Sequence, residues 1–329
     1  GQAPWDPHLT PSGWHGVTTV VMGNCGVGFA PAAPERRDWL IGLMEGVEDI
    51  PGTALAEGIQ WEWESFPEYL DALERMPRSL DVAAQVPHGA VRAYVMGERG
   101  ARNEKATDED KARMAALVGE AIAAGAVGFS TSRTLLHRAI DGEPVPGTFA
   151  SADELLAIGD AMKRGVLELA SDFTPEDGEL AWMAELSRRT GRPVTFACLQ
   201  NDGNPDQWKR LLEASERSAA EGGAVTPQVA ARPTGLLLGL QSTFHPFQAQ
   251  PSYREVASLP LAERVAALRD PARRQRIVTE KPEHPSPVAL FIAASFHKMF
   301  PLGDPPDYEP APESSVAARA KREGRTPQE

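Results

Sequence analysis

The residue with the clearest potential for chemistry is a cysteine in a glycine-rich turn. The stretch TTVVMGNCGVGFAP, residues 18–31, places Cys25 directly after a run of β-branched residues, with glycines at positions 23, 26 and 28. Glycine tolerates positive φ angles and close approach of a neighbouring backbone, so this pattern indicates a crowded turn. Cys25 is then a small buried residue, a nucleophile or a metal ligand, and the turn alone leaves all three open.

Other polar residues stand at the ends of short apolar runs, and one stands inside such a run. Those at or near run ends are His88, Ser132, Arg133, Asp172, Gln200 and Arg232. Glu168 lies within LELASD, and a carboxylate buried there needs a metal, an arginine or a hydrogen-bonded proton. Asp172 can alternatively be a helix N-cap. His88 is a metal ligand, a substrate donor or an ordinary loop histidine, and His137 and His245 lie in segments expected to be loops.

The order of expected elements indicates a parallel α/β protein. Apolar runs predict strands over 17–23, 79–87, 126–132, 166–172, 192–200 and 224–233. Helical patterns alternate with them over 35–46, 66–75, 107–126, 151–165, 176–190 and 206–222. Thr107 is expected to be an N-cap, and Ser151 with Glu154 to form a capping box. No Gly-x-Gly-x-x-Gly turn opens a helix, which favours an incomplete (β/α)8 barrel over a doubly wound sheet.

In such a barrel the side chains at the carboxyl ends of the strands form the active site. We expect residues 1–240 to form the central part of the barrel, strands 2–7. Residues 241–329 are expected to form a helical and proline-rich excursion, with helical pieces over 254–280 and an extended linker from 281 onward. The chain opens without methionine and closes on an amphipathic pattern without a cap, AARAKREGRTPQE, which predicts an internal piece of a longer protein.

Composition excludes several classes of partner. The formal net charge is −13 and no basic stripe is present, so nucleic acid and anionic membranes are not expected partners. No apolar run approaches the roughly 20 residues of a membrane span. Two cysteines cannot form a disulfide framework, and a reducing, cytoplasmic location is predicted.

Four motifs, in order over roughly residues 1–170, resemble one known family. They are GQAPWDPHLTPSGWHGVTTVVMGNCGVGFAP, VPHGAVRAYVMG, AIAAGAVGFSTS and PGTFAS. Together they resemble the N-acyl-D-amino-acid deacylases, or D-aminoacylases, of the amidohydrolase superfamily. The resemblance implies a metal-dependent hydrolase barrel in which Cys25 binds zinc, with one or two ions in the full-length protein.

The resemblance also implies site residues that this chain does not contain. The family's His-x-His pair would precede residue 1, and its general-base aspartate would lie beyond Glu329. Family members place histidines after their fifth and sixth strands, where this chain reads LELASDF and TFACLQND. Glu168, Asp172 and Gln200 are the candidates to replace those ligands with oxygen donors.

The resemblance therefore predicts hydrolysis of a C–N amide bond, with N-acyl-D-amino acids or a related small amide as substrate. An arginine, Arg92, Arg133 or Arg232, is expected to clamp the substrate carboxylate. Two alternatives stay open: a cyclic-amide hydrolase of the hydantoinase or dihydroorotase type, and a non-catalytic barrel with a degraded metal site that acts as a binding module.

Overall fold

The structure is a computed structural model that describes residues 2–48, 50–230, 235–240, 242, 244–284 and 286–329. The chain divides into two compact units, residues 1–231 (unit 1) and 232–329 (unit 2). Each unit is described by itself. Arg232, one of the expected substrate-binding arginines, lies outside the described residues.

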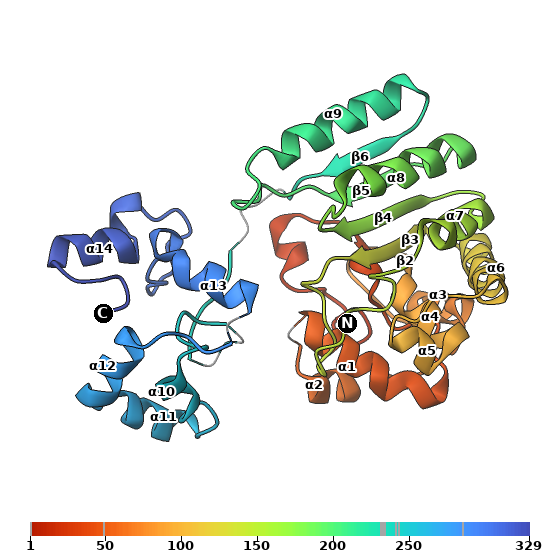
Figure 1. Ribbon diagram of the computed structural model, residues 1–329. Helices are drawn as coiled ribbons and strands as arrows, with labels where there is room; N and C mark the ends of the chain where they lie inside the picture. Colours follow the sequence, from red (N-terminus) through yellow and green to blue (C-terminus); the bar gives the residue numbers. More distant parts are fainter. Residues whose placement is uncertain (1, 49, 231–234, 241, 243, 285) are drawn as a thin grey trace. The chain divides into compact units, whose positions relative to one another are not determined.

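Unit 1 is built on a parallel sheet that curls into half a barrel (Figure 1). Within the described residues its six strands are β1 (Thr19–Met22), β2 (Asp81–Pro87), β3 (Gly128–Arg133), β4 (Val166–Ser171), β5 (Val194–Ala197) and β6 (Val225–Gln228). The strands follow one another across the sheet in chain order, and every adjacent pair is parallel. The predicted class, an incomplete (β/α) barrel, is confirmed.

Helices connect the strands along one face of the sheet (Figure 1). They are α1 (Arg37–Glu48), α2 (Gly52–Gly58), α3 (Phe66–Arg75), α4 (His88–Met96), α5 (Glu98–Ala101), α6 (Asp108–Ala124), α7 (Ala152–Ala161), α8 (Glu176–Thr190) and α9 (Gln207–Ala220). The sequence did not predict α2, α4 or α5. Helix α4 was not predicted because it begins at the residue after β2, where Pro87 and Gly89 indicate a turn.

The two predicted helix starts with capping residues have different outcomes. Thr107 and Asp110 form a reciprocal capping box at α6, as the N-cap prediction required. The capping box predicted for Ser151 and Glu154 is wrong, because Ser151 makes no side-chain cap and Glu154 instead turns into the protein. Helix α7 also ends at Ala161, before the predicted stop at 165.

The hydrophobic core lies between the sheet and its helices. Strand residues Phe129, Leu167, Leu169 and Phe196 are fully buried, as are helix residues Leu155, Ile158, Met183 and Leu186. Side chains alternate between the two faces of a strand, so the residues between these apolar ones point the other way. Glu168, between Leu167 and Leu169, therefore lies on the opposite, inner face of the curled sheet.

Unit 2 is formed by short helices. They are α10 (Pro251–Arg254), α11 (Leu261–Leu268), α12 (Pro271–Thr279), α13 (Pro287–Ala294) and α14 (Val316–Glu323). The extended linker predicted from 281 onward is wrong, since α13 and α14 lie there. Proline at the first helical position needs no N–H partner, and the Ser286 hydroxyl caps α13. The C-terminal sequence AARAKREGRTPQE, expected to lack a helix cap, does contain one. Helix α14 ends at Gly324, which has the left-handed conformation of a C-cap.

Every helix in the described part of the chain is too short or too polar to cross a bilayer.

Candidate functional site

The candidate site is organised by the turn that contains Cys25, η2 (Asn24–Gly26). Cys25 has φ 58°, and Gly23 and Gly26 have φ 89° and 72°. A Cβ on Gly26 would stand 2.8 Å from the backbone N of Ser132, and one on Gly23 would stand 2.5 Å from the Gln85 carbonyl oxygen. The turn therefore lies directly against β2 and β3, and it needs glycine at both positions for conformation and for space.

Cys25 and Glu168 meet on the inner face of the sheet, although 143 residues separate them in the chain. The Cys25 backbone N–H donates to Glu168 Oε2 at 3.1 Å, and the Glu168 side chain is only 2% exposed. The Gly26 N–H donates to Ser130 Oγ at 3.1 Å on the adjacent strand. These contacts aim the turn at the carboxylate and hold it there.

The protein environment raises the pKa of both donor groups, which keeps the Cys25 thiol neutral and makes Glu168 titrate near neutral pH. Burial raises the pKa of the Cys25 thiol to about 12, and the nearby Glu168 and Glu48 carboxylates raise it further. Burial also raises the pKa of Glu168 to about 7, against the lowering effect of the Cys25 N–H. A bound cation would reverse both effects, because it favours thiolate and carboxylate. The donor set, one sulfur and one carboxylate, thus fits a divalent metal.

Two further polar atoms on the inner face of the sheet lack hydrogen-bond partners. The hydroxyl of Thr195 and the side-chain oxygen of Gln85 are buried without a hydrogen bond. Thr195 stands beside Glu168 in the register of β4 and β5, so it shares the inner face. The Gln85 amide donates to Asn24 Oδ1 at 3.2 Å, next to Cys25. Unsatisfied buried polar groups are rare in proteins, and these two are on the same inner face as Cys25 and Glu168.

Ser132, at the end of β3, faces the same side and holds a histidine from the following loop. Its Oγ lies 2.9 Å from His137 Nδ1 in a hydrogen bond. Burial lowers the pKa of His137, partly offset by the charges of Glu48 and Asp172. Asp172 accepts a hydrogen bond from the Leu135 N–H at 2.9 Å, which anchors this loop. The N-cap alternative for Asp172 is wrong, because Pro175 precedes α8.

His88 and Arg92, two of the predicted substrate-binding residues, lie instead on the outer face, against the helices. His88 is fully buried at the start of α4, and its Nε2 donates to Glu154 Oε1 at 2.8 Å. Because burial lowers the pKa of His88, the ring is neutral and its Nδ1 accepts from the Thr131 hydroxyl at 2.8 Å. Arg92 Nη1 donates to Glu154 Oε2 at 2.6 Å. The structure therefore does not bring these two side chains together with Cys25.

His88, Arg92 and Glu154 form a buried cluster on the outer face, here called the outer cluster, in which the charges of Arg92 and Glu154 balance each other. Burial by itself would raise the pKa of Glu154, but the hydrogen bond from His88 and the charge of Arg92 lower it to about 2. Arg133 makes a similar arrangement farther along the same face, with Nε and Nη2 bound to the Glu179 carboxylate at 2.7 and 2.6 Å. Neither guanidinium is available to a ligand on the inner face.

The remaining predicted residue, Gln200, is exposed just beyond β5. Nowhere in the described ranges do three or more His, Cys, Asp or Glu side chains converge on a point that could hold a metal. Sequence reasoning missed Gln85 and Thr195. The sequence marks each of them as a polar residue between apolar neighbours in a strand. This pattern points to the site only when it is known which face of the strand lies on the inside of the sheet.

Comparison with known proteins gives a consistent assignment. A model of the amidohydrolase family matches residues 2–327. D-aminoacylase of Alcaligenes xylosoxydans xylosoxydans is 39% identical over 123 residues, which are 37% of this chain and 22% of that protein. N-acyl-D-glutamate deacylase of the same organism is 34% identical over 184 residues, 54% of this chain and 32% of that protein. A crystal structure of D-aminoacylase covers 67% of this chain and 43% of its own, with 26% identity and a TM-score of 0.49.

The chain thus spans between about a fifth and a third of the length of these curated relatives. The predicted resemblance to D-aminoacylases is confirmed by the same relatives. Because the family model matches nearly every residue, and because the fold is the expected half-barrel with Cys25 on its inner face, the chain belongs to the amidohydrolase family.

Proposed function

We propose that this chain is part of a zinc-dependent amidohydrolase that cleaves the amide bond of N-acyl-D-amino acids. The observation that carries the proposal is the meeting of half-buried Cys25 and buried Glu168 on the inner face of the sheet, with no Lys or Arg paired with Glu168 among the described residues. The identities to D-aminoacylase and N-acyl-D-glutamate deacylase support the substrate class.

In this proposal Cys25 Sγ and the Glu168 carboxylate are two of the ligands of the ion. A thiolate with an oxygen donor suits zinc, which accepts both kinds of ligand. When bound, the ion would supply Lewis-acid activation of water and of the scissile carbonyl. The glycines at 23 and 26 fix the position of the thiol, and the Cys25 N–H orients the carboxylate toward it.

The other inner-face residues are proposed to contact the substrate. His137 Nδ1 is held by Ser132, and its Nε2 has no hydrogen-bond partner among the described residues, which leaves it for a substrate group. Asp172 anchors the loop that carries His137, and Gln200 stands at the exposed end of the neighbouring strand. His88 and Arg92 act indirectly by fixing Thr131, the neighbour of Ser132. Arg232 as carboxylate clamp, and a general base supplied from outside this chain, stay predictions.

A metal titration tests the ligand assignment without reference to turnover. Adding Co²⁺ to the metal-free chain should produce a thiolate-to-metal charge-transfer band. Cys25→Ser should abolish the band, and Glu168→Gln should weaken metal binding by about 10- to 100-fold. Cys198→Ser is the matched control, because Cys198 is the chain's second cysteine and is expected to leave the band intact. Loss of the band in Cys198→Ser alone would overturn the assignment.

A substrate panel on the complete protein separates the remaining alternatives. Turnover of N-acetyl-D-amino acids, with N-acetyl-L-amino acids and dihydropyrimidines much slower, is the expected result. Faster turnover of dihydropyrimidines would instead establish the cyclic-amide hydrolase. Absence of both metal binding and turnover would identify a non-catalytic binding module.

A further inference from the structure

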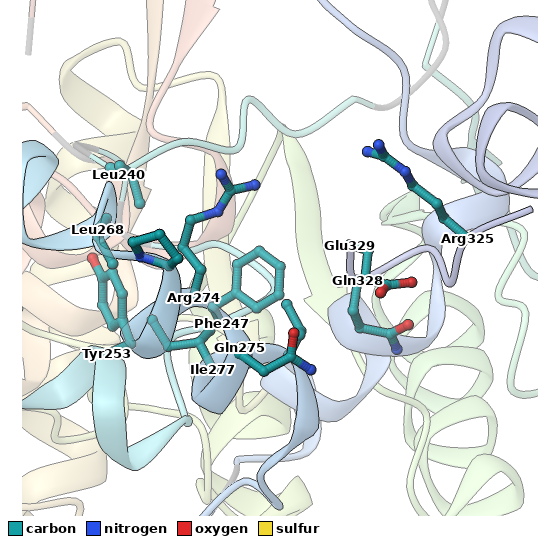
Figure 2. A pocket seen from close by; sticks show the side chains of 12 residues that line it. Leu240, Phe247, Tyr253, Leu268, Arg274, Gln275, Ile277, Arg325, Gln328 and Glu329 are labelled. Carbon is teal, nitrogen blue, oxygen red and sulfur yellow. The ribbon is translucent and has the colours of Figure 1, made fainter. Parts of the chain in front are cut away.

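Unit 2 contains a cavity that the proposed hydrolase site does not use. Its volume is about 580 Å³, within the roughly 300–1,000 Å³ typical of small-molecule sites. Leu240, Phe247, Tyr253, Leu268 and Ile277 provide an apolar wall (Figure 2). Arg274 and Arg325 lie on the two sides of the gap, with Gln328 and Glu329 beside Arg325. The cavity thus combines an apolar surface with two guanidinium groups.

The apolar wall is preformed. The ring of His245 packs edge-on to Tyr253, with 4.3 Å between ring centres, and His245 Nδ1 accepts from the Phe247 N–H at 3.2 Å. Arg264 donates to Tyr253 Oη at 3.4 Å and also to the Leu240 carbonyl. These contacts hold the Tyr253 ring and the Phe247 backbone in place, so a ligand need not order them.

The arginines of α12 differ in their partners. Arg273 donates to Glu255 at 2.7 Å, and Arg276 donates to Ser252 Oγ at 3.1 Å. The Arg274 side chain, which lines the cavity, makes no hydrogen bond or ion pair within the part of the chain that the structure describes, although its backbone N–H donates to the Asp270 carbonyl. Arg325 lies 3.9 Å from Glu323, and its charge is one of the influences that lower the pKa of Glu329. Arg274 is therefore the guanidinium group at the cavity that has no acidic partner among the described residues, whereas Arg325 has Glu323 and Glu329 nearby.

The charge around the cavity favours an anion carrying one charge. Residues 232–329 contain 13 Lys and Arg against 11 Asp and Glu, whereas residues 1–231 contain 20 against 35. Among the side chains that line the cavity, the two guanidinium groups and the Glu329 carboxylate carry one net positive charge, and the guanidinium without an acidic partner is that of Arg274. A singly charged carboxylate matches this balance better than a doubly charged phosphate monoester does.

We propose that this cavity binds an amphipathic monocarboxylate, a molecule with an alkyl chain and one carboxylate head. The head pairs with the guanidinium of Arg274, assisted by Arg325 across the gap, and arginine offers a carboxylate two parallel hydrogen bonds. The alkyl chain lies on Phe247, Tyr253 and Ile277, where its burial supplies the hydrophobic part of the affinity. The proposal is independent of the hydrolase site, since it uses residues of unit 2 alone.

Isothermal titration of the full chain with decanoate, below its micelle concentration, tests the proposal. We expect saturable binding at one site. Arg274→Ala should weaken it at least about tenfold, because a lost charge-assisted hydrogen bond removes that much affinity. Phe247→Ala should also weaken it. Arg269→Ala is the control for overall charge, because Arg269 is exposed on unit 2 and does not line the cavity.

A second titration uses decyltrimethylammonium, which has the same chain and the opposite charge. Absence of binding by this cation, with decanoate binding lost in Arg274→Ala and kept in Arg269→Ala, supports the site. Equal binding of both amphiphiles would show that the cavity recognises the alkyl chain and not the charge of the head group. This result would overturn the carboxylate assignment. So would equal effects of Arg274→Ala and Arg269→Ala, or no saturable binding of decanoate. Because Arg274 is exposed and unpaired, its substitution is not expected to disturb folding, and a melting curve checks this.

Discussion

The two faces of the sheet in unit 1 differ in whether a buried glutamate has a positively charged partner. On the outer face Glu154 is bound by both His88 and Arg92, so the charges are matched. On the inner face Glu168 receives one backbone N–H and faces a neutral thiol, with no cation at hand in the described residues. Matched charges are typical of a structural cluster, whereas unmatched buried donors are typical of a face that binds something. The difference points to the inner face as the functional one.

The largest expected effect is on the outer face. Glu154→Ala should lower the free energy of unfolding by about 3–5 kcal/mol, because it leaves the Arg92 cation buried without its partner. Denaturant unfolding measures the change. The matched control is Asp153→Ala on the same helix, where the side chain is mostly exposed and pairs with Lys111 at the surface. A similar loss in both variants would contradict the structural role given to the outer cluster.

The second prediction concerns Glu168 in metal-free protein. Its folded pKa of about 7 exceeds the ordinary value of 4.5, so the folded state binds this proton more tightly than the unfolded state. Stability from this group is complete below pH 4.5 and is lost as pH rises to about 7, in total about 3 kcal/mol. Glu168→Gln should remove that slope and stabilise the metal-free chain at pH 8. Denaturant midpoints across pH 4–8 in the presence of a chelator measure it, with exposed Glu213→Gln as the control. A slope that survives in Glu168→Gln would show that another group causes it.

Gly26 offers a smaller test of how the inner turn is held. Gly26→Ala should cost about 1–3 kcal/mol, because φ is 72° and the new Cβ would meet the backbone of β3 at 2.8 Å. It should also weaken metal binding, since Cys25 precedes it. Gly222→Ala has a similar φ of 82° but open space around the new Cβ, and it should cost less and leave metal binding unchanged. If the two variants were equal, the close approach of the turn to β3 would be in doubt.

The smallest expected effects concern two strand threonines, one on each face of the sheet. Substitution by valine should change the free energy of unfolding in a different direction on each face. Thr195→Val removes an inner hydroxyl that has no partner, so metal-free stability should stay the same or rise by up to about 1 kcal/mol. Thr131→Val removes an outer hydroxyl that donates to His88, so stability should fall by about 1 kcal/mol. Urea unfolding of the two variants side by side is the measurement. Loss of stability in Thr195→Val as large as in Thr131→Val would remove the distinction between the faces.

Local patterns predicted the regular elements well where local chemistry decides them. Helices α3 and α8 have the predicted bounds, and the Thr107 cap is present. Prediction failed where contacts distant in sequence take over. Glu154 has the spacing of a capping residue, but burial beside His88 and Arg92 draws it inward. Helix α4 has no side-chain cap to announce it, because it starts directly from the end of β2.

The amino-acid sequence alone determined the alternation of strands and helices, the resemblance carried by Cys25 and its glycines, and the excess of acidic residues over the whole chain. These are properties of neighbours along the chain. Only the tertiary structure decided that Glu168 faces Cys25 while His88 and Arg92 face the helices. The reason is that the face of a strand residue depends on register and on which helices cover the sheet, and contacts between residues far apart in the chain set both.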